Sequence, residues 1–127
     1  MKQVIFSLIE TECQDQQFDV NHLMMTLGLS NTYLRELTYK CYGQSPRELI
    51  ESIRLLRVLT YIDRDIALEV ISLKCGFGNY KTFRSAFKKR VGISAAKARE
   101  ELHKSENKEL LAERWKNQIW LGEVLTQ

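Results

Sequence analysis

Residues 75–94, CGFGNYKTFRSAFKKRVGIS, combine an apolar helical face with a dense run of positive charge. Phe83, Ala86 and Phe87 recur at the spacing of one face of an α-helix. Five basic side chains occupy the remaining helical surface, namely Lys81, Arg84, Lys88, Lys89 and Arg90. The stretch therefore predicts a helix that packs on one side and presents cations on the other.

The positive charge of the chain is unevenly distributed. Residues 79–99 contain seven basic residues and no acidic one. Residues 1–99 carry 15 Lys and Arg against 10 Asp and Glu, whereas residues 100–127 carry 4 against 6. A basic block of this kind raises the local affinity for anions such as nucleic acid. A solvated charged face is the plainer alternative, and composition alone leaves both open.

The length and composition are those of a small globular protein. The 127 residues suit one compact domain, or two very small ones that share a helix, and 44% hydrophobic residues can form a core. No apolar stretch reaches the roughly 20 residues of a membrane span, and the N-terminus lacks the pattern of a signal peptide. Cys13, Cys41 and Cys75 are odd in number and far apart, which is typical of a reducing cytosol. We therefore expect a cytoplasmic protein without disulfides.

Helix signals recur along the chain, and no segment has the pattern of a strand. The strongest start is SPRE at 45–48, where Ser45 can cap, Pro46 can take the first helical position and Glu48 can close a capping box. Other expected caps are Asp19, Ser30, Asn79 and Ser94. Glycines at the ends of the periodic segments are expected stops, namely Gly28, Gly43, Gly76 and Gly92. These signals predict an all-α fold.

An internal repeat relates two parts of the chain. Residues 23–43, LMMTLGLSNTYLRELTYKCYG, align with residues 71–92, ISLKCGFGNYKTFRSAFKKRVG. Each copy has a short apolar helix, a turn with a glycine before an apolar residue, a cap, a second helix and a final glycine. This is the pattern of a helix-turn-helix, whose second helix can enter the major groove of DNA. One such pattern occurs often by accident, but two copies joined by one capped helix rarely do.

From about Asp19 to Arg99 the chain resembles the two-headed DNA-binding domain of AraC/XylS-type transcriptional regulators. The resemblance is carried by LGLSNTYL at 27–34, by LIESIRLLRV at 49–58 with Arg54 at the family's arginine position, and most specifically by residues 75–94. The sequence departs from the usual family pattern at Met24, Thr38, Ser72 and Ala95.

The resemblance implies a domain organisation and a function. We expect a first helix-turn-helix subdomain at 1–44, a connecting helix at 45–63, a second helix-turn-helix subdomain at 64–100 and a helical tail of unknown role at 101–127. The implied function is sequence-specific binding of double-stranded DNA by a bacterial transcriptional regulator that inserts its two recognition helices into successive major grooves. RNA polymerase, a separate sensor domain and a second copy of the chain are further partners that the sequence leaves open.

The helical phase predicts which side chains face the bases. With Leu34, Leu37 and Cys41 inward, the first recognition helix exposes a set of polar side chains, of which we expect base reading from Asn31, Thr32, Arg35 and Glu36. Arg35 is the main candidate because its fork matches guanine O6 and N7. Glu36 can instead pair with Lys40 at i+4, which we favour. In the second recognition helix the outward candidates are Tyr80, Lys81, Arg84 and Ser85, and the resemblance assigns base contacts to Tyr80, Lys81 and Ser85.

Helix N-termini and further cations are candidates for phosphate contacts. Such groups position a protein on DNA without reading its sequence. The expected phosphate ligands are Ser30, Tyr39, Lys88, Lys89, Arg90, Ser94 and Arg99. For Arg54 two interpretations stay open: a DNA ligand, or a structural arginine that holds the two heads together.

The sequence gives no support for catalysis or for a metal or cofactor site. His22, His103 and the three cysteines lack the spacing of metal ligands. The GFG at 76–78 follows no strand and precedes no Gly-Lys-Ser/Thr, so it is not a phosphate-binding loop. No Ser-His-Asp or paired-carboxylate arrangement is present. We therefore expect no enzyme activity, metal or cofactor, and we expect Cys41 and Cys75 to be packing residues rather than redox sensors or alkyl acceptors.

Residues 101–127 lie beyond the resemblance. Leu111, Trp115 and Ile119 form one helical stripe, with Trp120 and Val124 nearby. This stripe can pack back on the domain, which is the interpretation we favour, or it can form a partner or dimer surface, since tryptophans often anchor interfaces. The second interpretation supports an alternative function, a helical protein-interaction module that acts through this tryptophan-containing helix.

Overall fold

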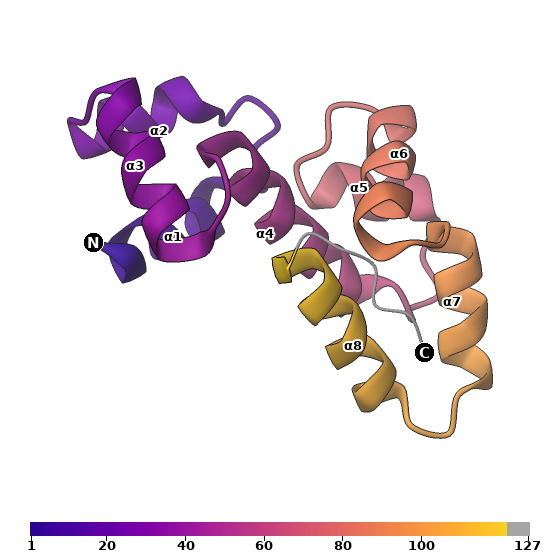
Figure 1. Ribbon diagram of the computed structural model, residues 1–127. Coiled ribbons are helices and arrows are strands. Elements are labelled where there is room, and N and C mark those ends of the chain that lie inside the picture. Colours follow the sequence, from indigo (N-terminus) through magenta and orange to yellow (C-terminus); the bar gives the residue numbers. More distant parts are fainter. Residues whose placement is uncertain (122–127) are drawn as a thin grey trace.

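The computed structural model describes residues 1–121, which form eight α-helices and no strand. As Figure 1 shows, the helices are α1 (Lys2–Glu12), α2 (Val20–Leu27), α3 (Asn31–Tyr42), α4 (Pro46–Tyr61), α5 (Leu68–Lys74), α6 (Tyr80–Val91), α7 (Ala95–Lys104) and α8 (Lys108–Leu121). The predicted all-α fold is confirmed, with helix-turn-helix pairs α2–α3 and α5–α6. No helix in this described part of the chain is long and apolar enough to span a membrane.

Local capping interactions determine where most helices begin. At the start of α4 the Ser45 hydroxyl accepts a hydrogen bond from the Glu48 amide at 3.2 Å, and the Glu48 carboxylate accepts one from the Ser45 amide at 3.1 Å. The bond from the Ser45 N–H holds the pKa of Glu48 below its usual value. The side chains that cap α2, α3, α6 and α7 are those expected from the sequence, namely Asp19, Ser30, Asn79 and Ser94.

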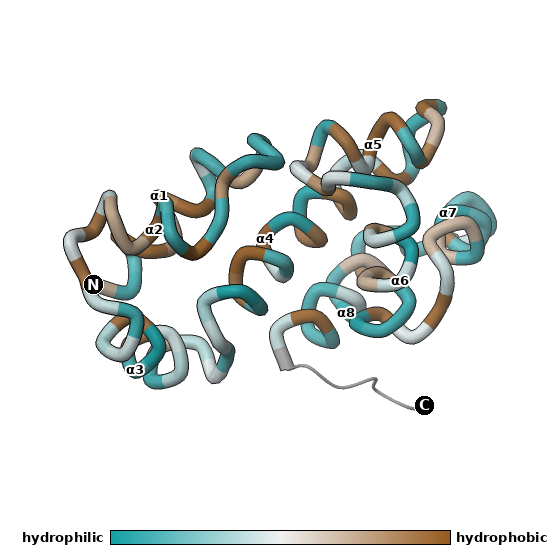
Figure 2. Tube along the Cα trace, turned by 90° about the horizontal axis from the view of Figure 1, so that it is seen from above, coloured by the Kyte–Doolittle hydropathy of each residue, from teal (hydrophilic) through white to brown (hydrophobic). Residues whose placement is uncertain are grey.

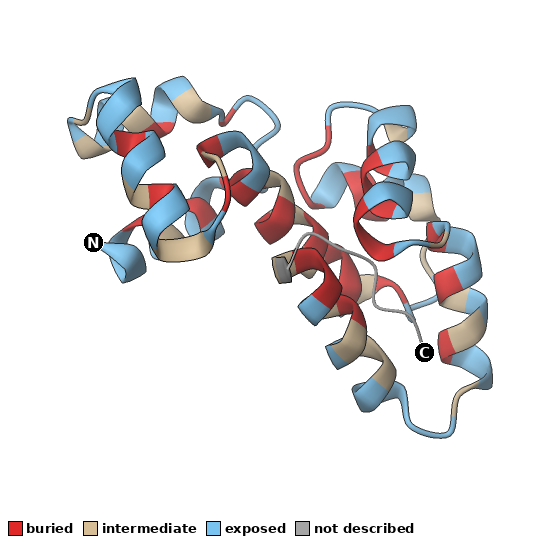
Figure 3. Ribbon diagram, viewed as in Figure 1, coloured by how far each residue is buried: buried red, intermediate tan, exposed pale blue. Residues whose placement is uncertain are grey.

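The helix α4 completes two hydrophobic cores. We call α1–α3 the first head and α5–α7 the second head. Leu49, Ile50 and Ile53 of α4 lie in the core of the first head, whereas Val58 and Ile62 lie in the core of the second. Figure 2 shows α4 crossing between the heads with hydrophobic segments along its length, and Figure 3 shows that its buried residues extend over most of the helix.

The inward face of α3 differs in detail from the expected one. Leu34 and Thr38 are fully buried, whereas Leu37 and Cys41 are only partly buried. The Thr38 hydroxyl donates to the Arg35 carbonyl at 3.2 Å, so this buried polar group is satisfied. The buried face of α3 is therefore centred on Leu34 and Thr38, and Thr38 was not among the residues expected to face inward.

The predicted helical tail, residues 101–127, includes the end of α7 and all of α8. The helix α7 continues beyond the predicted boundary at residue 100 and ends at Lys104. In α8, Trp115 and Ile119 are buried in the core of the second head, and Trp120 packs against the first. Of the two interpretations left open, α8 follows the first and packs back on the chain. Residues 122–127, with Val124 among them, lie outside the described residues.

Arg54 and Gly76 take part in a direct contact between the two heads. The Arg54 guanidinium donates to the carbonyls of Cys13 at 2.9 Å, Asp15 at 3.0 Å and Phe18 at 2.9 Å, which follow α1. Gly76, in the turn before α6, lies so close that an added Cβ would be 1.9 Å from the Cys13 oxygen and 2.7 Å from Arg54 Nε. Burial lowers the pKa of Arg54. The structure therefore gives Arg54 the structural role, one of the two that the sequence left open.

Replacing Gly76 should damage this contact between the heads. Gly76 has φ +96°, a conformation unfavourable for other residues, and a new Cβ would overlap backbone that cannot easily move. We expect Gly76→Ala to lower the free energy of unfolding by about 3 kcal/mol. Gly28→Ala is the matched control, since Gly28 also has positive φ but open space around it, and should cost about 1 kcal/mol. Urea unfolding measures both, and equal losses would contradict the close approach.

The cysteines should differ in reactivity. Burial raises the pKa of Cys75 from 9.0 to about 12 and also raises that of Cys13. The thiolate is the nucleophile, so a raised pKa keeps both groups protonated and unreactive at pH 8. Iodoacetamide should therefore label the half-buried Cys41 first, and Cys13 and Cys75 only after unfolding. Mass spectrometry of a labelling time course checks this, and early labelling of Cys75 in folded protein would contradict it.

Candidate nucleic-acid interface

The outward face of α3 carries the residues expected to read bases. Asn31, Thr32, Arg35 and Glu36 are all exposed, and so is Tyr39, which was expected to contact phosphate. The Arg35 guanidinium lies 5.5 Å from the centroid of the Tyr39 ring, a cation–π arrangement that supports the guanidinium from one side. No ion pair joins Glu36 to its i+4 neighbour within residues 1–121, so the pairing that the sequence favoured is not formed. The Glu36 carboxylate thus keeps its capacity to accept from a base amine.

The outward face of α6 borders a groove of about 460 Å³. It is lined by most of the predicted site residues of the second head and by the start of α7, namely Tyr80, Lys81, Arg84, Ser85, Lys88, Ser94, Ala95 and Ala96. The Arg84 guanidinium lies 5.7 Å from the Tyr80 ring centroid. Tyr80 is half-buried and its ring stacks on Phe83 at 5.9 Å, so its position is fixed by the core. The groove brings cations and a helix N-terminus together on one surface.

Two predicted phosphate ligands, Ser30 and Ser94, are exposed N-caps. The Ser30 hydroxyl accepts from the Tyr33 amide at 3.2 Å, and the Ser94 hydroxyl accepts from the Lys97 amide at 3.1 Å. Other amides of the first helical turn have no partner within the helix and carry its positive dipole end. Both sites can therefore receive an anion through the backbone as well as through the hydroxyl.

Lys88 and Lys89 lie on different sides of α6. Lys88 borders the groove beside α7. Lys89 is exposed on the side toward α4, where it lines a second hollow together with Glu51 and Thr82. The two neighbouring lysines therefore point to different sides of α6 and can contact different parts of a bound ligand.

The position of Arg90 differs from the prediction that it contacts phosphate. Its side chain is 8% exposed and does not join the charged surface. Nη1 donates to the Glu51 carboxylate at 2.9 Å, and Nη2 donates to the Ile119 carbonyl at 2.7 Å and to the Ser52 hydroxyl. Three of its five N–H donors are used inside the protein and the side chain is almost wholly buried, so Arg90 does not reach the surface where the predicted phosphate contact would form.

Arg99 is also committed within the chain. Its Nε donates to the Ile62 carbonyl at 2.8 Å and its Nη2 to the Ile66 carbonyl at 2.6 Å, and the residue is half-buried. These carbonyls belong to the loop that follows α4, just as the Arg54 acceptors belong to the loop that follows α1. These bonds give Arg99 a structural role, and its predicted phosphate contact stays a prediction.

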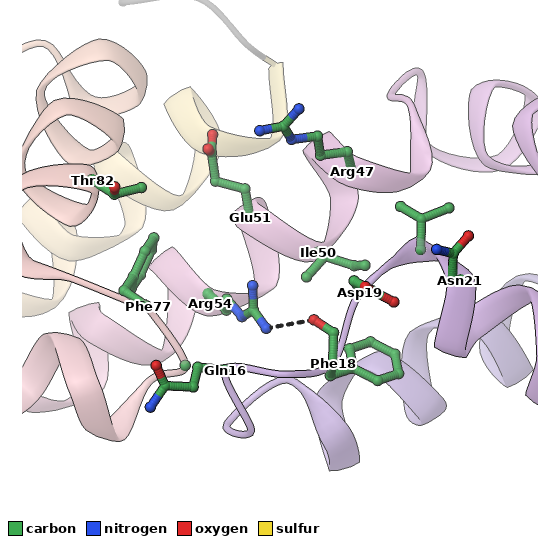
Figure 4. Close-up of a pocket in the computed structure, with 13 residues that line it drawn as sticks. Gln16, Phe18, Asp19, Asn21, Arg47, Ile50, Glu51, Arg54, Phe77 and Thr82 are labelled. Atoms are coloured by element: carbon green, nitrogen blue, oxygen red, sulfur yellow. Dashed lines mark hydrogen bonds between the residues drawn. The ribbon is translucent and has the colours of Figure 1, made fainter.

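Sequence reasoning missed three exposed side chains near the predicted surfaces. Tyr33 is half-exposed on the first turn of α3, and Met25 is exposed on α2. Arg47, at the start of α4, lines a cleft of about 440 Å³ between the heads, which Figure 4 shows with Asn21 on one side and Thr82 on the other. SPRE was predicted to have only a capping role, yet Arg47, two residues after the cap Ser45, is exposed. No group of three or more His, Cys, Asp and Glu gathers for a metal ion within residues 1–121.

Two solved structures share this arrangement. The C-terminal domain of the two-component response regulator yesN from Fusobacterium nucleatum has a TM-score of 0.72 and 25% identity, over 77% of this chain and 96% of that one. The C-terminal domain of AraT, a response regulator from Geobacillus stearothermophilus, has a TM-score of 0.72 and 20% identity, over 78% and 83% of the two chains. The second similarity concerns the fold alone.

Sequence comparison identifies the same region. "Histidine kinase P4" from Formosa agariphila is 31% identical over 86 residues, which are 67% of this chain but only 6% of the length of that protein. A family described as a helix-turn-helix domain matches residues 23–101, which include both helix-turn-helix pairs and the helix between them. This match covers more than half of the chain, and the AraC/XylS resemblance is confirmed. The chain belongs to the AraC-type helix-turn-helix family of DNA-binding transcription regulators.

Proposed function

We propose that this protein binds double-stranded DNA in a sequence-specific manner, with α3 and α6 each reading a major groove. One observation carries the proposal: both second helices of the repeat bury one face in a head and expose a polar, cation-bearing face. The arginine–tyrosine pairs Arg35–Tyr39 and Tyr80–Arg84 lie on those exposed faces. Arginine is the side chain that most often reads guanine in the major groove.

The length of α4 limits how the two heads can meet DNA. Its 16 residues span about 24 Å, whereas successive major grooves on one face of B-DNA are about 34 Å apart. If both recognition helices enter a groove, the DNA must bend toward the protein to close the difference. The heads carry different side chains, so the preferred site is asymmetric and needs no palindrome.

The residues divide between reading and positioning. We assign base contacts to Arg35 in the first head and to Lys81, Arg84 and Ser85 in the second. We assign phosphate contacts to Lys88 and Ser94, which share the groove between α6 and α7, and to Lys89 on the other side of α6.

A signalling partner is part of the proposal. The two solved relatives are C-terminal domains of response regulators, and the curated relative is named as a histidine kinase. These names support control of DNA binding by a sensor or receiver segment. RNA polymerase, which the sequence left open as a partner, is the downstream partner that we propose for a transcription regulator. The alternative function, a protein-interaction module, required Trp115 and Trp120 to be exposed. Trp115 is instead buried, and Trp120 packs on Phe6 and Tyr42, which argues against this alternative.

Selection from a random duplex library tests the function directly. We expect one enriched asymmetric site about two helical turns long. If about six phosphates are neutralised, the logarithm of affinity should fall with the logarithm of salt concentration at a slope of about −5. Fluorescence anisotropy on the selected duplex and a scrambled one measures both quantities. Equal affinity for the two duplexes would disprove specific recognition, and a slope near zero would disprove DNA binding.

Arg35 and Lys89 should act differently on this site. Arg35→Ala should cost about 1–3 kcal/mol on the selected duplex and relax the preference at one base pair. Lys89→Ala should weaken binding to all duplexes alike and reduce the salt slope by about one contact. Lys108→Ala, at the exposed start of α8, is the matched control and should change neither. A shift of base preference in Lys89→Ala but not in Arg35→Ala would reverse the two assignments.

A further inference from the structure

A ring of buried hydrogen bonds joins the C-terminal ends of the two recognition helices. Arg90 Nη2 donates to the Ser52 hydroxyl and to the Ile119 carbonyl. The one proton of the Ser52 hydroxyl has two acceptors, Gln44 Oε1 at 2.6 Å and the backbone carbonyl four residues earlier in α4 at 2.9 Å. Gln44 Nε2 donates to the Trp120 carbonyl at 3.1 Å. Ile119 and Trp120 are consecutive, so the ring closes through a single peptide unit of α8.

The ring connects four separate parts of the chain. Gln44 follows the end of α3, Arg90 is the last residue but one of α6, Ser52 lies in the middle of α4, and α8 supplies the two carbonyls. The side chains of Gln44, Ser52 and Arg90 are 5%, 0% and 8% exposed. A buried polar group without a partner is costly, so the ring strongly favours the one arrangement of the four segments that satisfies every member.

The apolar contacts of α8 also divide between the heads. Ile119 lies in the core of the second head, whereas Trp120 packs against the first. The Trp120 ring stacks on Tyr42, the last residue of α3, with centroids 5.9 Å apart, and lies 6.3 Å from the Phe6 ring. Figure 3 shows the buried part of α8 at its C-terminal end, next to α4. Two successive residues of one helix therefore hold two different heads.

The helix α8 lies outside the part of the chain that matches the family. The match ends at residue 101, before α8 begins at Lys108. The heads and α4 are thus the shared framework, and α8 adds a further connection between heads that α4 and the contact at Gly76 already join. A connection at a different place from α4 resists rotation of one head relative to the other about the axis of α4, and α4 alone resists this rotation less well.

We propose that α8, acting through Trp120 and the Gln44–Ser52–Arg90 ring, fixes the separation and rotation of α3 relative to α6 and thereby selects the base-pair spacing between the two half-sites. The inference rests on the proposed DNA-binding function. One inserted base pair moves a half-site by about 3.4 Å and turns it by roughly 35°. Rigidly joined heads cannot follow this change, whereas loosely joined heads can.

Two variants loosen the bridge without altering the proposed reading surfaces. Trp120→Ala removes the stacking on the first head, and Gln44→Ala opens the ring between Ser52 and α8. Leu110→Ala is the matched control, because Leu110 lies on the same helix but is 67% exposed. Circular dichroism verifies the helical content of each variant, and each of the two tests the proposal independently.

The experiment measures affinity on a panel of duplexes derived from the selected site. The panel contains the site itself, versions with one or two base pairs inserted or deleted between the half-sites, and versions with either half-site scrambled. Wild type should lose about tenfold or more in affinity on a one-base-pair change of spacing. Trp120→Ala and Gln44→Ala should lose less than about threefold there, while scrambling a half-site should cost them as much as it costs wild type. Leu110→Ala should behave as wild type.

Three outcomes would overturn the proposal. The first is an unchanged spacing profile in both folded variants. The second is a uniform loss on every duplex, which is what a merely structural role of α8 predicts. The third is a wild-type protein that binds its selected site specifically but tolerates all spacings. If wild type does not prefer the selected site to a scrambled duplex, the proposed function itself fails, and the inference fails with it.

Discussion

The structure depends on one constraint: α4 must complete two hydrophobic cores at the same time. Leu49 and Ile53 face the first core, and Val58 and Ile62 face the second, so neither head can turn about α4 without exposing apolar surface. The orientation of α3 relative to α6 therefore depends first on the position along α4 at which the apolar side chains stop facing the first core and start facing the second. The burial of α4 establishes this orientation of the two heads. The contact between Arg54 and Gly76, and the packing of α8, then stabilise it.

The repeat uses the same framework twice but different surfaces. Arg54 holds the loop after α1 and Arg99 holds the loop after α4, in both cases by donating to backbone carbonyls. The exposed faces differ, since the arginine precedes its tyrosine in α3 and follows it in α6. The two heads therefore share the way an arginine holds a loop, while each carries its own set of exposed residues.

A feature could be predicted from the sequence when the residues that determine it are close together in the chain. Helix starts such as Ser45 are decided within four residues, so the caps were predictable. The exposed faces of α3 and α6 followed from helical periodicity. Arg90 was misassigned because its charge was weighted above its position: with Phe83 and Phe87 it occupies i, i+4 and i+7 of the buried face. Its partners are 38 and 39 residues away in α4 and 29 away in α8, and no local pattern reveals them.

The position of α8 in chain order has a consequence for synthesis. The first core is assembled from α1, α2, α3 and the first half of α4, all of which leave the ribosome before the second head is complete. The second core needs Trp115 and Ile119, which are translated later. Because domains generally fold as units, with the N-terminal part first, we expect the first head to fold while the second is still being made. The two-headed shape is thus the last property that a nascent chain acquires, and an incompletely translated chain presents one folded head alone.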